Sequence, residues 1–465
     1  MFKNIFLLRP LLAVLVLFIP LYPKFPLAHV TGTYVAIRLD DIVVASILFV
    51  WLIHQIKHRF PILKEPITKL VIAYFITIVA SFVTAILIYQ TDPPKILLLH
   101  LLRRFEYMSL LFLTISAIKK YEDIKHLYIF SLISTVGVLL YGYGQKFLSF
   151  PVISTMNSEF SKGQWLQFDV WSRLSSTFAG HYDLAIYLSV MLIIIGGVAV
   201  TQKNIWLKIL SLIIWIFSYD MLTLTASRVS IFSFFVGMSL CLIIIRKYLW
   251  IIPVTILVAS SIFASKDLNQ RLLATIPALQ QQFFPSKPQP TATPTVPVIA
   301  VVTKTITQPV KGGKTTPVPT IIRHGPIDEY IPPDADAGVA RSGEIRFNAE
   351  WPRAITAYRK NMLLGTGLGS ITLATDNDYL RNLGESGLLG FITFSAIFIF
   401  FTVKTVPKIF VKKMDNSNKL SLILFASMIT FLLNATLIDA FEASKTAYTF
   451  WIMMGIYYSV LTKKI

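Results

Sequence analysis

The stretch YDLAIYLSVMLIIIGGVAV, residues 182–200, decides the fold class. No charged side chain follows Asp183 within it, and a helix of about 20 apolar residues crosses roughly 30 Å of hydrocarbon. Similar stretches recur along the chain, which is 55% hydrophobic and only 14% charged, with a mean hydropathy of +0.65. A water-soluble protein could not keep that much apolar surface in water. The sequence therefore predicts an all-α integral membrane protein.

Apolar runs of this kind predict about twelve transmembrane helices. The first follows Lys3, and no small-residue cleavage site follows it, so we interpret it as an uncleaved helix and not as a removed signal peptide. The twelve segments are 5–22, 37–55, 67–89, 96–117, 125–146, 182–200, 205–222, 227–245, 248–264, 385–406, 419–438 and 446–462.

The distribution of Lys and Arg predicts the orientation. Cytoplasmic loops of membrane proteins carry an excess of these residues. Here they occupy alternate connections, and all fall on one side if twelve spans are correct: Lys57, Arg59, Lys64, Lys119, Lys120, Lys203, Arg246, Lys247, Lys412 and Lys413. Both termini are then cytoplasmic, and the connections at 23–36, 90–95, 147–181 and 265–384 are extracytoplasmic.

This topology divides the chain into three parts. Residues 1–264 form a membrane domain with helices one to nine, and residues 385–465 hold helices ten to twelve. Between them, 265–384 is a large extracytoplasmic loop. Its stretch 285–320 is rich in Pro and Thr, which is typical of an extended or disordered linker. Its segment 340–384 has mixed charge and aromatic residues, which predicts an ordered functional segment.

Composition also narrows the chemistry. The single cysteine excludes a disulfide framework or a Cys-based metal site within one chain. We find no His, Asp and Glu spacing typical of a metal site, so we expect neither metal nor cofactor. The net charge of +19 is spread over many short loops. This favours contact with anionic membrane lipids over binding of nucleic acid.

Arginines of the predicted outer side are candidate substrate-binding residues. Arg341, Arg346 and Arg353 lie close together in RSGEIRFNAEWPR, and Arg228 opens the helix at 227–245. A guanidinium donates two parallel hydrogen bonds and keeps its charge, which suits a diphosphate. The alternatives are a solvated amphipathic helix on the membrane for residues 341–353, and snorkelling or internal pairing for Arg228.

The sequence TDNDYL precedes the tenth predicted helix and offers acids for general base catalysis. Asp376 and Asp378 are the candidate catalytic residues, with Asn377 and Tyr379 beside them as substrate-binding candidates. Asp and Asn are also good helix N-caps, so capping is an equal alternative. Glu350 is a further acidic candidate on the same side.

Three further groups carry weaker signals. Arg173 and His181 precede the sixth helix, and His181 is either a substrate-binding group or an ordinary interfacial polar residue. The motif GTGLG at 365–369 favours a tight turn over a phosphate loop, because no Lys-Ser/Thr follows it. Arg103, Arg104 and Glu106 interrupt the fourth helix, where an internal Arg–Glu pair that orients helices is a plausible structural role.

Together these motifs resemble the O-antigen ligase/polymerase family of bacterial glycan enzymes. The resemblance is carried by RLSSTFAGHYDLAIYL (173–188), TASR (225–228), residues 346–351, GTGLG (365–369) and DNDYLRNLGESGLLG (376–390). Each motif is short, but their order is specific, and the likeness covers most of the chain from about residue 30, excluding the linker.

The resemblance implies a type C glycosyltransferase of the bacterial cytoplasmic membrane. Such an enzyme takes a polyprenyl-diphosphate-linked glycan donor and a glycan acceptor, and needs no metal. Ligases of this family typically carry His-Asn where this chain has Asp376-Asn377, which favours polymerisation over ligation. An Asp carboxylate can still accept the proton of the acceptor hydroxyl while arginines stabilise the departing diphosphate.

Two other functions fit a polytopic membrane protein. A transporter or flippase of lipid-linked glycans is expected to show internal repeats and broken helices at the membrane midplane. We find no repeat, and the polar residues collect on one side. A peptidoglycan glycosyltransferase of the shape, elongation, division and sporulation type would share the fold, but the long loop with its arginines fits the first family better.

Overall fold

The computed structural model describes residues 7–23, 26–29, 36–89, 94–152, 173–264, 345–371 and 374–462. All of them belong to one compact unit, Met1–Asn269 together with Glu344–Ile465. The predicted linker at 285–320 and the candidate residue Arg341 lie outside the described residues.

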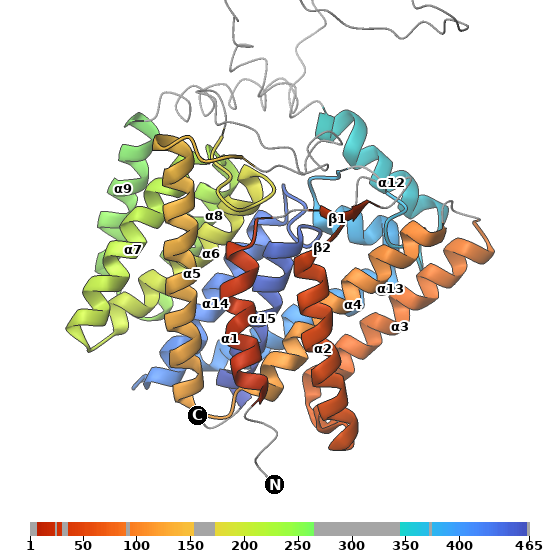
Figure 1. Ribbon diagram of the computed structural model, residues 1–465, viewed down its shortest axis with the longest axis horizontal. Helices are drawn as coiled ribbons and strands as arrows, with labels where there is room; N and C mark the ends of the chain where they lie inside the picture. Colours follow the sequence, from red (N-terminus) through yellow and green to blue (C-terminus); the bar gives the residue numbers. More distant parts are fainter. Residues whose placement is uncertain are drawn as a thin grey trace, which may run out of the picture. The chain divides into compact units, whose positions relative to one another are not determined.

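A helix lies at each of the twelve predicted segments (Figure 1). They are α1 (Leu8–Leu21), α2 (Leu39–Lys57), α3 (Pro66–Leu87), α4 (Pro94–Ala117), α5 (Tyr121–Phe147), α6 (His181–Thr201), α7 (Ile205–Leu224), α8 (Arg228–Ile244), α9 (Ile251–Ala264), α13 (Asp378–Ile409), α14 (Asn416–Asn434) and α15 (Ser444–Thr462). An additional helix, α12 (Trp351–Lys360), follows a π-helical turn, η5 (Arg346–Glu350).

Within the described part of the chain, seven helices are long and apolar enough to cross a membrane: α2, α3, α5, α6, α7, α13 and α14. Leu8–Leu21, Arg228–Ile244 and Tyr248–Ser261 are apolar but shorter. The charged residues of α4, among them Arg103, Arg104 and Glu106, lower its hydropathy. The protein is therefore a helical, multi-pass membrane protein.

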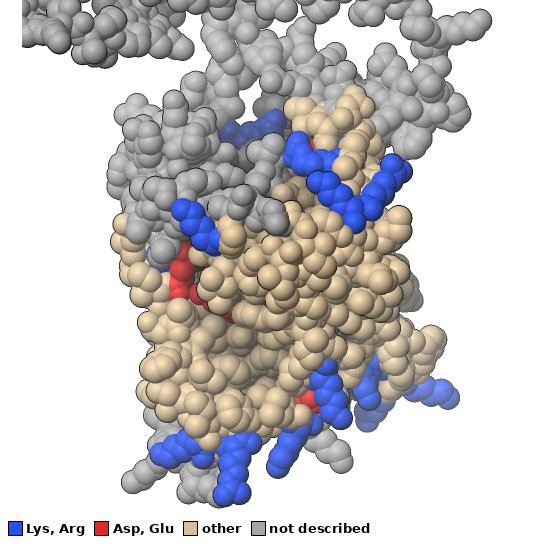
Figure 2. Space-filling model, turned by 90° about the vertical axis from the view of Figure 1, so that its right-hand side faces the viewer, with Lys and Arg blue, Asp and Glu red and all other residues tan. Residues whose placement is uncertain are grey.

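The surface agrees with this assignment. In Figure 2, Lys and Arg side chains gather towards the two ends of the helix bundle, and a broad band between them is almost free of charge. Such a band is expected where lipid chains contact the protein. Helix α6 contains the apolar stretch 182–200. It is the most enclosed of the seven candidate spans, with 78% of its most apolar 18 residues buried inside the protein.

Polar contacts hold α6 at the centre. The amide of Asn434, near the end of α14, donates to Ser189 of α6 at 3.2 Å, and its oxygen accepts from Ser230 of α8 at 2.7 Å. All three side chains are fully buried. Buried polar groups of this kind fix how helices are rotated about their axes, because each needs its partner.

The break within α13 has a clear cause. Gly387 has φ +67° and ψ −170°, a conformation essentially restricted to glycine, and it interrupts the helix. The freed backbone groups pair with residues 362–367: Leu388 N–H donates to Met362 at 2.8 Å, and Gly367 N–H donates to Glu385 at 2.9 Å. The GTGLG motif therefore makes the turn that closes this break, and its three glycines all have positive φ.

A two-stranded antiparallel ribbon, β1 (Pro26–His29) with β2 (Ala36–Arg38), joins α1 to α2. The all-α prediction did not include it. Strands of four and three residues are too short to show the alternating pattern that identifies a strand from sequence.

Candidate functional site

One end of the bundle collects the candidate residues. We call it the α12 end, because η5 and α12 cross it (Figure 1). There α6 begins at His181, α8 at Arg228 and α13 at Asp378. Helix N-termini carry partial positive charge and unpaired N–H groups, which favour anions.

An ion pair forms the centre of the site. Nε and Nη2 of Arg346 donate to the same carboxylate oxygen of Asp376, at 3.0 and 2.8 Å. Both side chains are largely buried, with 13% and 26% of their surface exposed. Asp376 has φ +49°, in the left-handed region that side chains other than glycine adopt at a cost. The loop thus holds this carboxylate in a strained conformation facing η5.

A chain of polar contacts leads from this pair to the N-terminus of α6. Tyr182 lies close enough to Arg346 to contribute to the raised pKa of its guanidinium. The rings of Tyr182 and His181 lie 4.1 Å apart, and Nη1 of Arg173 lies 2.8 Å from Nε2 of His181. The structure therefore brings together four residues that the sequence predicted separately: Arg173, His181, Arg346 and Asp376.

Glu350 adds a second carboxyl group to the site. Its Oε2 atom is buried without a hydrogen-bond partner among the described residues. Burial and the neighbouring Asp376 carboxylate raise the pKa of Glu350 to about 7. The pKa of Asp376 is also raised, because burial and the Asp439 carboxylate outweigh the opposing effect of Arg346. Both groups therefore titrate closer to neutral pH than ordinary carboxyls, as a general base requires.

Asp439, in the connection between α14 and α15, positions the Asp376 loop. Its carboxylate accepts from the backbone N–H of Thr375 at 2.8 Å, from that of Asn377 at 3.3 Å and from Nη1 of Arg381 at 2.9 Å. Two of these donors flank Asp376. The sequence analysis missed Asp439. The sequence signal that could have indicated Asp439 is its position, as an acid in the short connection between the last two predicted helices.

The neighbours of Asp376 are engaged in local structure. The Asn377 side chain is the N-cap of α13 and accepts from the N–H groups of Tyr379 and Leu380. The predicted start of this helix was residue 385. The helix begins earlier, at Asp378, because Asn377 caps it there. The hydroxyl of Tyr379 donates to the Leu432 carbonyl at 2.8 Å.

Asp378, predicted as the second candidate base, holds the connection between α14 and α15. Its carboxylate accepts from the N–H groups of Ala440 and Phe441 at 2.6 and 3.1 Å, and the residue is only 5% exposed. These contacts leave Asp376 as the better placed of the two acids for chemistry.

The arginines separate into different environments. Arg228 is partly buried at the start of α8, where the neighbouring Ser227 donates to Ser230 and Ser230 donates to Asn434 of α14. Arg353 lies on α12, seven residues beyond Arg346, and lines a cavity described below. Arg353 also opposes the rise in the pKa of Glu350 and therefore lies near the Arg346–Asp376 site.

Charged side chains of α4 pair with other elements. Arg104 hydrogen-bonds Glu442 of the α14–α15 connection, and His100 lies 3.8 Å from the same carboxylate. Arg103 lies 3.6 Å from Asp41 of α2. The Arg104–Glu442 contact fits the predicted internal Arg–Glu pair that orients helices.

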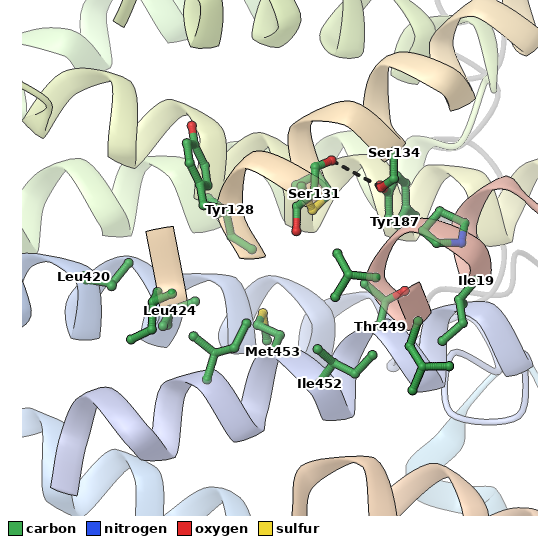
Figure 3. A pocket seen from close by; sticks show the side chains of 17 residues that line it. Ile19, Tyr128, Ser131, Ser134, Tyr187, Leu420, Leu424, Thr449, Ile452 and Met453 are labelled. Carbon is green, nitrogen blue, oxygen red and sulfur yellow. Dashed lines mark hydrogen bonds between the residues drawn. The ribbon is translucent and has the colours of Figure 1, made fainter. Parts of the chain in front are cut away.

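A separate cavity of about 80 Å³ lies between α1, α5, α6, α14 and α15 (Figure 3). Its lining is apolar apart from hydroxyls, including those of Ser134 and Tyr187, which lie 3.3 Å apart. No charged side chain lines it. The cavity therefore offers no charged group to an anion.

The site can supply a carboxylate base, a guanidinium for an anionic group, and a histidine and tyrosine nearby. Among the described residues, no group of three or more His, Cys, Asp and Glu side chains could hold a metal ion. No protein-family model and no curated protein matches the chain.

Proposed function

We propose that the protein is a membrane glycosyltransferase that polymerises polyprenyl-diphosphate-linked oligosaccharides on the extracytoplasmic face of the bacterial cytoplasmic membrane. In this proposal the chain has about twelve transmembrane helices and a type C architecture, with both termini in the cytoplasm and the α12 end outside. Ligation of the glycan to another acceptor is the alternative. The proposal places the protein with the O-antigen ligase/polymerase enzymes, which its motifs resemble.

The observation that carries the proposal is the buried Arg346–Asp376 pair at the start of α13, in contact with Tyr182. Transfer of a glycan from a diphosphate to a hydroxyl needs a proton acceptor and a cation for the departing anion. This pair contains both, within hydrogen-bond distance of each other.

The pair also suggests the order of events. Without substrate, Arg346 occupies the carboxylate oxygen that would act as the base. A diphosphate that binds the guanidinium competes for those hydrogen bonds and frees the carboxylate. The acceptor hydroxyl then attacks the anomeric carbon, its proton passes to Asp376, and the bond between that carbon and the diphosphate oxygen breaks. In this proposal Arg173 and His181 contact the same substrate.

Asp376→Asn in a glycan-assembly assay tests this proposal. The N-cap of α13 belongs to Asn377, so the substitution does not remove it. We expect normal amounts of folded protein in the membrane and no polymer. Arg346→Lys should also impair polymer formation, because an ammonium cannot donate as the guanidinium does. Polymer formation by Asp376→Asn at the wild-type rate would rule out Asp376 as the base.

A further inference from the structure

A cavity of about 440 Å³ lies between α12, the loop that follows it, and the end of α3. Its lining includes no Asp or Glu, and it includes none of the residues that form the Arg346–Asp376 site. The polar residues that line it are Tyr89, Arg353, Thr356, Lys360, Thr366 and Ser370. Its lining is therefore electropositive, and it borders the Arg346–Asp376 site through Arg353, which acts on Glu350.

One face of α12 forms a wall of the cavity. Arg353, Thr356 and Lys360 are spaced at i, i+3 and i+7, which places them on one side of a helix. The Nη1 atom of Arg353 is buried and has no hydrogen-bond partner among the described residues. A buried guanidinium donor without an acceptor is costly, so an anion in the cavity that draws the Arg353 side chain toward it would remove that cost.

The opposite wall adds a pair of hydroxyls. Thr366 Oγ1 and Ser370 Oγ lie 2.7 Å apart in the glycine-rich loop. The hydroxyl of Tyr89 donates to the carbonyl of Lys360 at 3.0 Å and so connects the end of α3 to the end of α12. Two cations and a hydroxyl donor, with no carboxylate, are suited to a phosphate group.

The depth of the cavity indicates the source of that phosphate. The candidate membrane span α3 ends at Leu87, and Tyr89 follows two residues later. Tyrosines are enriched at this boundary between hydrocarbon and headgroups. Figure 2 shows the face that carries α3, α12 and α13, and Lys and Arg side chains gather at its upper end. The cavity thus lies where lipid headgroups are.

We propose that this cavity binds the phosphate of an anionic phospholipid headgroup. Arg353 and Lys360 supply the charge, and the Thr366–Ser370 pair can supply one hydroxyl donor, since the Thr356 hydroxyl already donates to the Pro352 carbonyl. Because α12 continues directly from η5, a lipid bound here holds the element that carries Arg346. The inference needs only the membrane location of the protein and does not rest on the proposed reaction.

Native mass spectrometry of the purified full chain in detergent tests this, with dioleoyl-phosphatidylglycerol as the probe. We expect Arg353→Gln/Lys360→Gln to weaken the tightest binding event about tenfold or more, because hydrogen bonds to charged groups are lost. Lys360→Gln alone, at an exposed position, should give a smaller loss without risk to folding. Arg359→Gln is the matched control, since it removes one charge from an exposed position of α12 that does not line the cavity.

Three results would overturn the proposal. The first is equal phosphatidylglycerol binding by wild type and both cavity variants. The second is binding of inorganic phosphate as tight as that of the lipid, which would assign the cavity to a free anion. The third is displacement of the lipid by an equal concentration of farnesyl diphosphate, which would assign the cavity to a diphosphate donor.

Discussion

Asp439→Asn provides a test of how the candidate site is held together. The carboxylate accepts three hydrogen bonds, two from backbone N–H groups beside Asp376 and one from Arg381. An asparagine side chain has one acceptor oxygen, and its NH₂ group faces donors, so at least one buried donor loses its partner. Arg381 keeps the Ile371 carbonyl and the Glu385 carboxylate, which limits the loss. We expect about 2–4 kcal/mol of destabilisation.

Chemical denaturation in detergent, followed by tryptophan fluorescence, measures this change. Asp415→Asn is the matched control, because Asp415 caps α14 through one hydrogen bond to Asn418 N–H and Asn caps about as well as Asp. The control should unfold like wild type, and Asp439→Asn should unfold at clearly lower denaturant concentration. If the two variants unfold together, Asp439 does not organise the loop as described.

Three further predictions concern the turn, the titration and the orientation. Gly365→Ala should prevent accumulation of folded protein, because the added Cβ would lie 2.4 Å from a backbone atom at a residue with φ +69°. Gly137→Ala should be milder, because its Cβ meets only the end of a flexible leucine side chain. Equal yields of the two variants on fluorescence-detected size exclusion would contradict this prediction. Since Glu350 ionises with a pKa of about 7, the KM for the lipid-linked donor should rise as pH increases through 7, and Glu350→Gln should remove that rise; an unchanged pH profile of KM would contradict the assignment. In a cysteine-free background, Arg359→Cys should react with an impermeant thiol reagent in intact cells and Lys412→Cys only after lysis; the reverse pattern would invert the proposed topology.

The helices could be predicted from the sequence because long apolar runs give a strong local signal. The twelve predicted segments all contain a helix, although seven of the described helices meet the length and hydropathy of a membrane span. The start of α13 was placed several residues late because TDNDYL is polar and resembles a loop. The cap formed by Asn377 begins the helix within that polar sequence.

The site could be predicted only in part because its geometry depends on contacts between distant segments. The side-chain chemistry of Arg346 and Asp376 marks them as candidates in the sequence. Their direct pairing, however, depends on how η5 crosses the start of α13. Asp439 is separated from the loop it positions by more than 60 residues, and no local pattern links the two. The break at Gly387 depends in the same way on residues 362–367.

The most direct test of the proposed function is the stoichiometry of the reaction in proteoliposomes. Purified wild-type protein is supplied with a polyprenyl-diphosphate-linked oligosaccharide, and both new glycosidic bonds and free polyprenyl diphosphate are measured. We predict one polyprenyl diphosphate released for each bond formed, and neither product with Asp376→Asn. Movement of the intact donor across the bilayer, with no release of polyprenyl diphosphate, would contradict the account and indicate a transporter.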